Sequence, residues 1–269
     1  MKIIISHDVD HLLNREHRFK DLILEKLIVR SIIQFCKGRI PFKTLNKRCC
    51  FYFRKRFNRI PELIGFDKKH GIPSTFFFGM NQGLGMNYKP HDAIPYIQQV
   101  REGGLDVGVH TVEIDDFDII KKEHDTFSSL SGLSSYGTRI HYVRYDEETF
   151  PKLAKAGYLF DTSEFDKTES SLKQPYRVSE MWEFPLHIME SYILSWGGVE
   201  SAKQKTVSLF DRAEAVGIEY FSMLFHDSYF DEELYPEEYS YYKWFVKECE
   251  ERGYTFVSYS KAIQELNER

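Results

Sequence analysis

Short apolar runs alternate along the chain with segments of helical periodicity. Residues 2–6 form one such run, rich in β-branched side chains, which is typical of a buried strand. Strands that alternate with helices form βαβ units, so the pattern predicts a parallel barrel or a doubly wound sheet. The expected strands are residues 2–6, 74–78, 105–109, 138–146, 158–162, 181–185, 220–225 and 255–258, and the expected helices are residues 21–35, 92–101, 118–130, 147–156, 199–216, 235–252 and 261–268.

Ionisable residues follow the apolar part of several expected strands. The first strand is expected to end where His7 begins, and Asp8 and Asp10 then face the same side because one residue separates them. Two carboxylates beside imidazoles suit a divalent cation and an acid–base pair, whereas the alternative is a cluster that caps the following helix. The carboxyl ends of parallel strands meet at one mouth of a barrel. The residues expected there are Asp8, Asp10, His110, Arg144, Asp161 and His226.

A helical segment of about residues 12–70 interrupts the βαβ order after the first strand, in what is otherwise one domain over residues 1–269. Its part from 37 to 59 holds nine basic residues and no acid. The rest of the chain then carries −14, since the net charge is −5. Contact with an anionic membrane is one interpretation, with Cys36, Phe42, Phe51, Phe53 and Phe57 as apolar anchors. The alternatives are a solvated helical face, or aromatic packing of the insertion onto the barrel.

Composition narrows the class of protein. The net charge of −5 argues against a nucleic-acid-binding protein, and no stretch is long and apolar enough for a membrane span or a signal peptide. The four cysteines are Cys36, Cys49, Cys50 and Cys249, and they lack metal-binding spacing. We therefore expect a reduced, cytoplasmic protein, which the basic segment would hold at the inner membrane face. The 17 Tyr and 22 Phe are typical of a large core or of a cleft that binds sugars.

The order of these motifs resembles the polysaccharide deacetylases, the NodB-homology or carbohydrate esterase family 4 group. Asp8-Val9-Asp10, His110-Thr111, Val143-Arg144-Tyr145 and Leu224-Phe225-His226-Asp227 match its motifs in sequence order. The opening His-Asp-Val-Asp and the segment 139–144 are similar to a WbmS-like subgroup from surface-polysaccharide loci.

The resemblance implies an irregular (β/α)7 barrel that uses one divalent metal ion, Zn or another, to remove acetyl groups from N-acetylated sugars. Asp8 would be the catalytic base, Arg144 would orient it, and His226 would be the acid. Asp161 loosely matches a further catalytic aspartate of the family. Asp10 and His110 would bind the metal.

One position departs from the family pattern. Ile114 stands where the second histidine of His-x-x-x-His belongs, so the metal would lack its third protein ligand. His141 is the favoured replacement because it sits on a neighbouring expected strand, and the other candidates are Glu113, Asp115 and His7. If none of them reaches the metal, the protein would bind a harder metal weakly, or none.

Three functions follow from these observations. The first is a metal-dependent deacetylase of a surface polysaccharide or its precursor, with a carbohydrate substrate and no nucleic-acid partner. The second is a carbohydrate-binding barrel with impaired catalysis, suggested by Ile114. The third is a hydrolase of non-sugar amides, because a fold alone does not fix a function.

Overall fold

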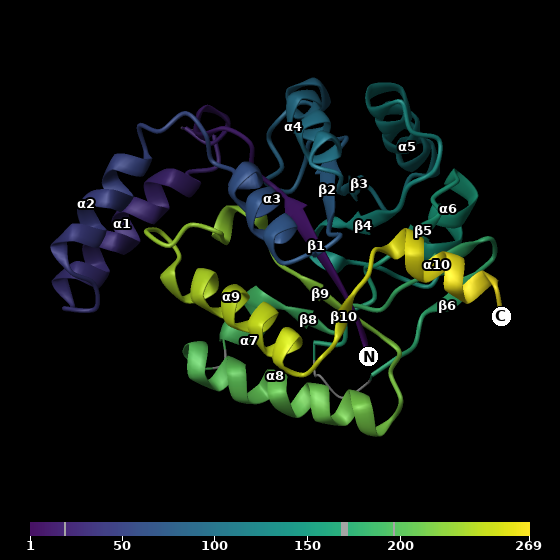
Figure 1. Ribbon diagram of the computed structural model, residues 1–269. Helices are drawn as coiled ribbons and strands as arrows, with labels where there is room; N and C mark the ends of the chain where they lie inside the picture. Colours follow the sequence, from purple (N-terminus) through teal and green to yellow (C-terminus); the bar gives the residue numbers. More distant parts are fainter. Residues whose placement is uncertain (19, 168–171, 196) are drawn as a thin grey trace.

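The strands form one curled sheet with helices packed around its outside (Figure 1). The computed structural model describes residues 1–18, 20–167, 172–195 and 197–269. Within these residues the strands are β1 (Lys2–Val9), β2 (Thr75–Gly79), β3 (Asp106–Thr111), β4 (Thr138–Ile140), β5 (Phe160–Asp161), β6 (Tyr176–Val178), β7 (Met181–Glu183), β8 (Ile188–Met189), β9 (Tyr220–Leu224) and β10 (Thr255–Phe256).

Seven of the described α-helices begin and end within two residues of the expected segments, two more lie in the expected helical insertion, and the helix at 190–195 was not expected. The α-helices are α1 (Ile23–Cys36), α2 (Phe42–Phe51), α3 (Ile60–Lys69), α4 (Pro90–Glu102), α5 (Phe117–Ser131), α6 (Thr149–Ala156), α7 (Glu190–Ser195), α8 (Gly198–Ala215), α9 (Pro236–Glu251) and α10 (Tyr259–Asn267). Three 3-10 turns complete the described chain, η1 (Asn14–Glu16), η2 (His141–Val143) and η3 (Asp227–Tyr229). None of the described helices is long and apolar enough to cross a bilayer.

The sheet order is β6-β7-β5-β4-β3-β2-β1-β9-β8, and β10 pairs with the start of β1. All pairings are parallel except that of β6 with β7, which form a hairpin. A continuous segment, residues 181–189, carries β7 near one end of this order and β8 at the other, and thereby closes the curl. Its Phe184 amide donates to the Asp161 carbonyl of β5, and its His187 amide donates to the Ser222 carbonyl of β9. The expected (β/α)7 barrel is therefore confirmed.

Strand β1 continues through the ionisable cluster instead of ending at His7, so that boundary was wrong. Polar side chains remain in a buried strand when partners satisfy them. His7 points outward, where its ring bonds to the Asp67 carboxylate and the Phe225 carbonyl, both at 2.9 Å. Asp8 points into the barrel, on the same side as Ile4. Alternation along β1 thus sends His7 to the helices and Asp8 to the interior.

Tyr259, the first residue of α10, fills the end of the barrel opposite the carboxyl ends of the strands. Its fully buried ring stacks on Phe160, with 4.4 Å between ring centroids, and packs beside Phe77. Its hydroxyl lies 3.0 Å from Thr162 Oγ1 and accepts from Arg139 at 3.2 Å. The barrel is therefore a packed core at this end, and an active site can form only at the carboxyl ends of the strands.

Helices α1 and α2 form a hairpin that projects from the barrel, whereas α3 lies against it like the other crossover helices (Figure 1). We call α1, α2 and their connection the α1–α2 hairpin. Phe51 and Phe57 are buried with Leu24 and Leu234, so for these two aromatics packing is the correct explanation. Ion pairs add to this attachment, as in the 3.1 Å contact between Arg54 and Glu233.

Four expected strands are clearly shorter in the structure, and those over 158–162 and 255–258 are strands only at Phe160–Asp161 and Thr255–Phe256. The run over 138–146 is a strand only as far as Ile140, after which the backbone turns. The run over 181–185 is shorter, and its partner β6 was not anticipated, because the exposed residues 176–178 lack the apolar pattern of a buried strand.

Glycine substitutions test how tightly the barrel is packed. A Cβ at Gly108 on β3 would lie 2.7 Å from both the Gly137 carbonyl oxygen and the Phe77 ring. Gly108→Ala should therefore lower the free energy of unfolding by about 1–3 kcal/mol in urea denaturation. The control is Gly65→Ala at an exposed position of α3, where nothing lies within 4 Å, and it should stabilise by about 0.5–1 kcal/mol. Equal effects at both positions would contradict this packing.

Candidate active site and metal centre

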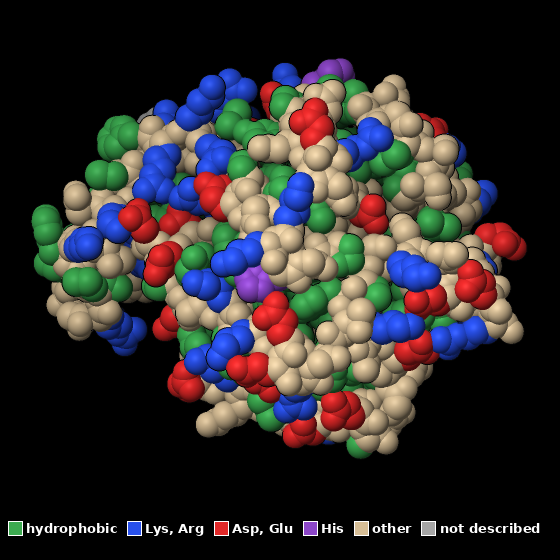
Figure 2. All heavy atoms as spheres, in the orientation of Figure 1, with side chains coloured by type: hydrophobic (Ala, Val, Ile, Leu, Met, Phe, Trp, Pro, Cys, Tyr) green, Lys and Arg blue, Asp and Glu red, His purple; other side chains and the backbone are tan. Residues whose placement is uncertain are grey.

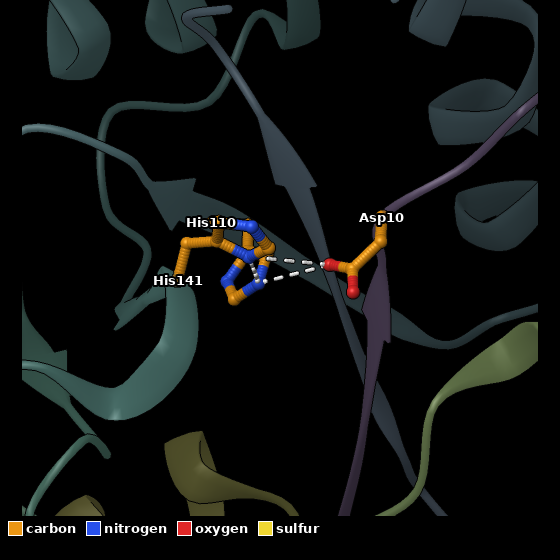
Figure 3. Close-up of side chains that lie close together, drawn as sticks. All are labelled: Asp10, His110 and His141. Carbon is orange, nitrogen blue, oxygen red and sulfur yellow. Dashed lines mark hydrogen bonds and ion pairs between the residues drawn. The ribbon is translucent and has the colours of Figure 1, made fainter. Parts of the chain in front are cut away.

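Side chains from the ends of three strands, β1, β3 and β4, converge at the mouth of the barrel (Figure 3). Asp10 follows β1, His110 lies on β3, and His141 opens the turn after β4. His110 Nε2 lies 3.2 Å from Asp10 Oδ1 and 3.0 Å from His141 Nδ1. The remaining separation, from His141 Nδ1 to Asp10 Oδ1, is 3.5 Å. The expected set of Asp10, His110 and His141 is thus brought together.

Hydrogen bonds to the other ring nitrogens orient both imidazoles. His110 Nδ1 lies 2.9 Å from the Arg139 carbonyl, and His141 Nε2 lies 3.2 Å from the Leu84 carbonyl. A carbonyl accepts only, so each of these nitrogens carries the proton in a neutral ring. His110 Nε2 and His141 Nδ1 therefore direct lone pairs at the same point, which is how metal-binding histidines are usually held.

The donor set fits a zinc ion. Ligand atoms about 2.0–2.1 Å from a tetrahedral zinc lie roughly 3.3–3.4 Å from one another. The three observed separations of 3.0, 3.2 and 3.5 Å lie around that value. In addition, Asp10 Oδ1 is buried without a hydrogen-bond partner among the described residues. Two lone pairs and an unpaired carboxylate oxygen around one point match the ligand chemistry of a divalent cation.

The other candidates for the third ligand lie elsewhere. His7 faces the helices, as described above. Glu113 Oε1 accepts the backbone N–H groups of the next three residues and thereby shapes its own loop. Asp115 is exposed, and Ile114 packs against the apolar core.

A left-handed turn directly after His141 fixes that side chain in place. Tyr142 has φ 64° and Val143 has φ 45°, both unusual for residues with a Cβ and costly when the residue is β-branched. The Tyr142 hydroxyl donates to the Leu84 carbonyl at 3.0 Å, and its ring packs beside that of His141. The alternation of apolar and polar residues here suggested a continuing strand, so the turn could not be predicted from the local pattern.

Arg139, and not Arg144, holds Asp8. The Arg139 guanidinium is fully buried and donates to Asp8 Oδ1 at 3.3 Å. Arg144 donates instead to the carbonyls of His141 and Val112, so the expected Arg144–Asp8 contact was wrong. The register explains the difference, because Arg139 pairs directly with His110 and points into the barrel. Arg144 lies beyond the turn, where it steadies the loop that carries His141.

His226 stands across the mouth from His110 and is paired with Glu190, a residue that sequence reasoning missed. His226 Nδ1 lies 2.6 Å from Glu190 Oε1, and Nε2 lies 3.7 Å from Asp10 Oδ2. Burial acts to lower the pKa of His226, but the Glu190 carboxylate outweighs it and raises the pKa to about 10. His226 therefore carries a proton at neutral pH. Glu190 has no sequence signal because it opens α7, far from the matching motifs.

The same cluster lowers the pKa of Asp10 and raises the pKa of His110. Burial acts to raise the pKa of Asp10, but His141, His110 and His226 hold it well below its ordinary value. Burial acts to lower the pKa of His110, and the nearby Asp8 and Asp10 carboxylates raise it. Asp10 is thus an anion throughout the neutral range, as a metal ligand must be.

Asp161 is not brought to the pocket. Its fully buried carboxylate accepts the Ser163 amide at 3.0 Å and the Ser163 hydroxyl at 2.8 Å. Glu183 lies beside it, and burial together with Asp161 raises the pKa of Glu183 well above its ordinary value. Neither residue lines the pocket at the mouth, so the catalytic role expected for Asp161 has no geometric support.

A pocket of about 490 Å³ opens at the mouth of the barrel. Asp8, Asp10, His141 and His226 are among the polar groups that line it. Its wall also contains aromatic rings from four separate segments, which are Phe57, Tyr142, Tyr192, Tyr229 and Tyr235. Aromatic faces beside convergent polar groups are the usual lining of small-molecule sites.

Histidine removal tests the metal centre. His110→Ala and His141→Ala should each weaken Zn²⁺ binding by more than about 100-fold. Each variant deletes a ligand, and mutation of a residue that only orients a ligand already lowers metal affinity by about 10–100-fold. Calorimetric titration and elemental analysis of purified protein measure this. His91→Ala, which removes an exposed histidine on α4, is the matched control and should bind as wild type does. Unchanged binding in His141→Ala would rule out that residue as the third ligand.

The His226–Glu190 pair predicts a pH dependence for the metal-free protein. The folded pKa of about 10 exceeds the ordinary 6.5, so the folded state binds this proton more tightly. Its stabilisation is complete below about pH 6.5 and is lost as the pH rises toward 10. Glu190→Gln should lower the His226 pKa in an NMR titration and flatten this loss in urea unfolding. Glu148→Gln, at an exposed position, should change neither, and an unshifted His226 in Glu190→Gln would contradict the pairing.

Comparison with known proteins places the fold. No known family profile matches the sequence, and no curated protein matches it either. Solved structures do match over nearly the whole chain. A Mycobacterium smegmatis protein described as a polysaccharide deacetylase superposes with a TM-score of 0.65 at 15% identity, covering 98% of this chain and 88% of that one.

Two further structures are similar. A Pseudomonas aeruginosa PAO1 protein, also described as a polysaccharide deacetylase, gives a TM-score of 0.60 at 11% identity, with 97% and 88% of the two chains covered. The Puue allantoinase gives 0.61 at 11% identity, with 97% and 87% covered. The chain therefore has the fold of the polysaccharide deacetylases.

Proposed function

We propose that this protein is a metal-dependent deacetylase of an N-acetylated sugar from a surface polysaccharide or its precursor. One observation carries the proposal: a donor set of Asp10, His110 and His141 adjoins a restrained carboxylate, Asp8, and a protonated imidazole, His226. Hydrolysis of an amide needs an activated water, a base and an acid for the leaving amine. These groups share one pocket.

The residues divide the work as follows. A divalent ion held by Asp10, His110 and His141 would lower the pKa of water and polarise the acetyl carbonyl. Asp8 is the carboxylate placed to take a proton from the attacking water, and it lies 3.6 Å from His110. Arg139 fixes the orientation of Asp8 through a bond to its Oδ1, which leaves Oδ2 on the side of His110.

His226 supplies the proton that the departing sugar amine requires. Its Nδ1 is held by Glu190, so Nε2 faces the site with its hydrogen. The raised pKa keeps this hydrogen in place at neutral pH. Collapse of the tetrahedral intermediate then breaks the C–N bond, the amine takes the proton from Nε2, and acetate leaves.

Two other functions remain as alternatives. A barrel that binds sugars without turnover was suggested by Ile114, but His141 supplies the donor that Ile114 cannot. A hydrolase of non-sugar amides is favoured by the similarity in fold to Puue allantoinase. The aromatic rings around the pocket favour a sugar, because the apolar faces of sugar rings pack on aromatic side chains.

Acetate release from N-acetylated oligosaccharides, with added Zn²⁺ or Co²⁺, tests the proposal. Asp8→Asn should lower the rate by about 10²–10⁴-fold, since it removes the base but keeps the size of the side chain. Asp115→Asn removes an exposed carboxylate on the loop after β3 and should leave the rate unchanged.

Other outcomes select the alternatives. No acetate from a broad glycan panel, together with retained sugar binding in calorimetry, would indicate a binding barrel. Hydrolysis of allantoin and related cyclic amides, without acetate release from glycans, would indicate a non-sugar amidase.

A further inference from the structure

Helix α1 carries an apolar stripe that faces solvent. Val29, Ile32, Ile33 and Cys36 follow the spacing of one helical face, and all four are exposed. Val29 is 56% exposed, and the two isoleucines are 45% and 47% exposed. A surface helix normally turns its apolar stripe toward the core, so this one lacks the partner that such a stripe indicates.

The stripe is not needed to hold the hairpin together. The opposite side of α1 packs through Leu24, which is buried with Phe51 of α2 and with Leu234. At the far end of the hairpin, Phe35 touches Phe42, yet Phe42 remains 68% exposed. The hairpin therefore has one apolar side that serves its own packing and a second one that faces outward.

The charge of this region is one-sided. Residues 26–61 contain no Asp or Glu. Four of their basic residues pair with carboxylates outside the hairpin, namely Lys47, Arg54, Arg56 and Arg59 with Asp231, Glu233 and Glu62. The other seven have no carboxylate partner in the described part of the chain, namely Lys26, Arg30, Lys37, Arg39, Lys43, Arg48 and Lys55. Figure 2 shows basic and hydrophobic side chains together over the hairpin, at the left.

We propose that the α1–α2 hairpin docks this protein on the surface of an anionic lipid bilayer. An apolar stripe bordered by cations is the chemistry of helices that lie in the headgroup region, where the apolar side chains enter and the cations meet lipid phosphates. A second copy of the chain fits this face poorly, since two hairpins placed face to face would bring like charges together.

The hairpin and the segment that follows α2 also form part of the pocket. Ile23, the first residue of α1, and Phe57, just after α2, both line the pocket. Val29 follows six residues later, about 9 Å along the helix axis. A protein docked through the stripe thus keeps its pocket within a short distance of the bilayer, in reach of a membrane-anchored substrate. Docking itself is independent of the reaction, so a failed deacetylase assay leaves it intact, and a failed docking assay leaves the deacetylase proposal intact.

Sedimentation with vesicles tests the docking. The full chain should pellet with phosphatidylcholine vesicles that contain phosphatidylglycerol, pellet much less with phosphatidylcholine alone, and be released by high salt. The triple variant Lys37→Gln, Arg39→Gln and Lys43→Gln should lose at least tenfold in partitioning. Its control removes the same charge elsewhere, by Lys68→Gln, Lys69→Gln and Lys89→Gln, all at exposed positions.

A second matched pair tests the apolar stripe. Val29→Ser should weaken binding to the anionic vesicles several-fold, whereas Val216→Ser, at a valine 65% exposed at the end of α8, should not. Both positions are exposed, so both variants should fold. Absence of wild-type binding, or equal losses in variants and controls, would overturn the proposal. So would a concentration-dependent dimer that disappears in Val29→Ser, because it would assign the stripe to a second copy.

Discussion

The buried contact between Arg139 and Asp8 is the constraint on which the barrel and its site both depend. Arg139 is fully buried inside the barrel and donates to groups from β1, from the end of β5 and from α10, namely Asp8, Ser6, Thr162 and Tyr259. A buried guanidinium without its carboxylate is strongly destabilising, on the order of 3–5 kcal/mol. The charge of Asp8 therefore stabilises the folded barrel, and the same bond sets the direction of that carboxylate at the mouth.

At the mouth of the barrel, Asp10, His110 and His141 each direct one ligand atom toward a common centre. His110 and His141 each donate a ring N–H to a backbone carbonyl, and the unprotonated nitrogen of each ring faces Asp10. The strained turn at Tyr142 and Val143 is the backbone cost of that arrangement, since a strand continued past Ile140 would carry His141 onward along the sheet. Strain at such a position is typical of functional sites, where the surrounding structure enforces it.

The insertion is linked to the same site through the loop after His226. Asp227 accepts the backbone N–H of Arg59, and the acidic residues that follow pair with the basic end of the hairpin. Four of the basic residues that the sequence displays here, Lys47, Arg54, Arg56 and Arg59, thus form ion pairs that attach the insertion. What remains exposed is concentrated on and around α1, together with the apolar stripe. The pocket wall and the outward face of the hairpin are parts of one packed unit.

The sequence by itself determined the alternation of strands and helices, and the strand ends on which Asp8, Asp10, His110 and His226 lie. Those features follow from local periodicity, which a single segment displays by itself. Strand pairing and loop geometry decided the rest, by setting Arg139 opposite His110, turning His141 back toward Asp10 and bringing Glu190 to His226. These contacts join residues far apart in the chain, so their geometry depends on register, closure and a left-handed turn that no local pattern encodes.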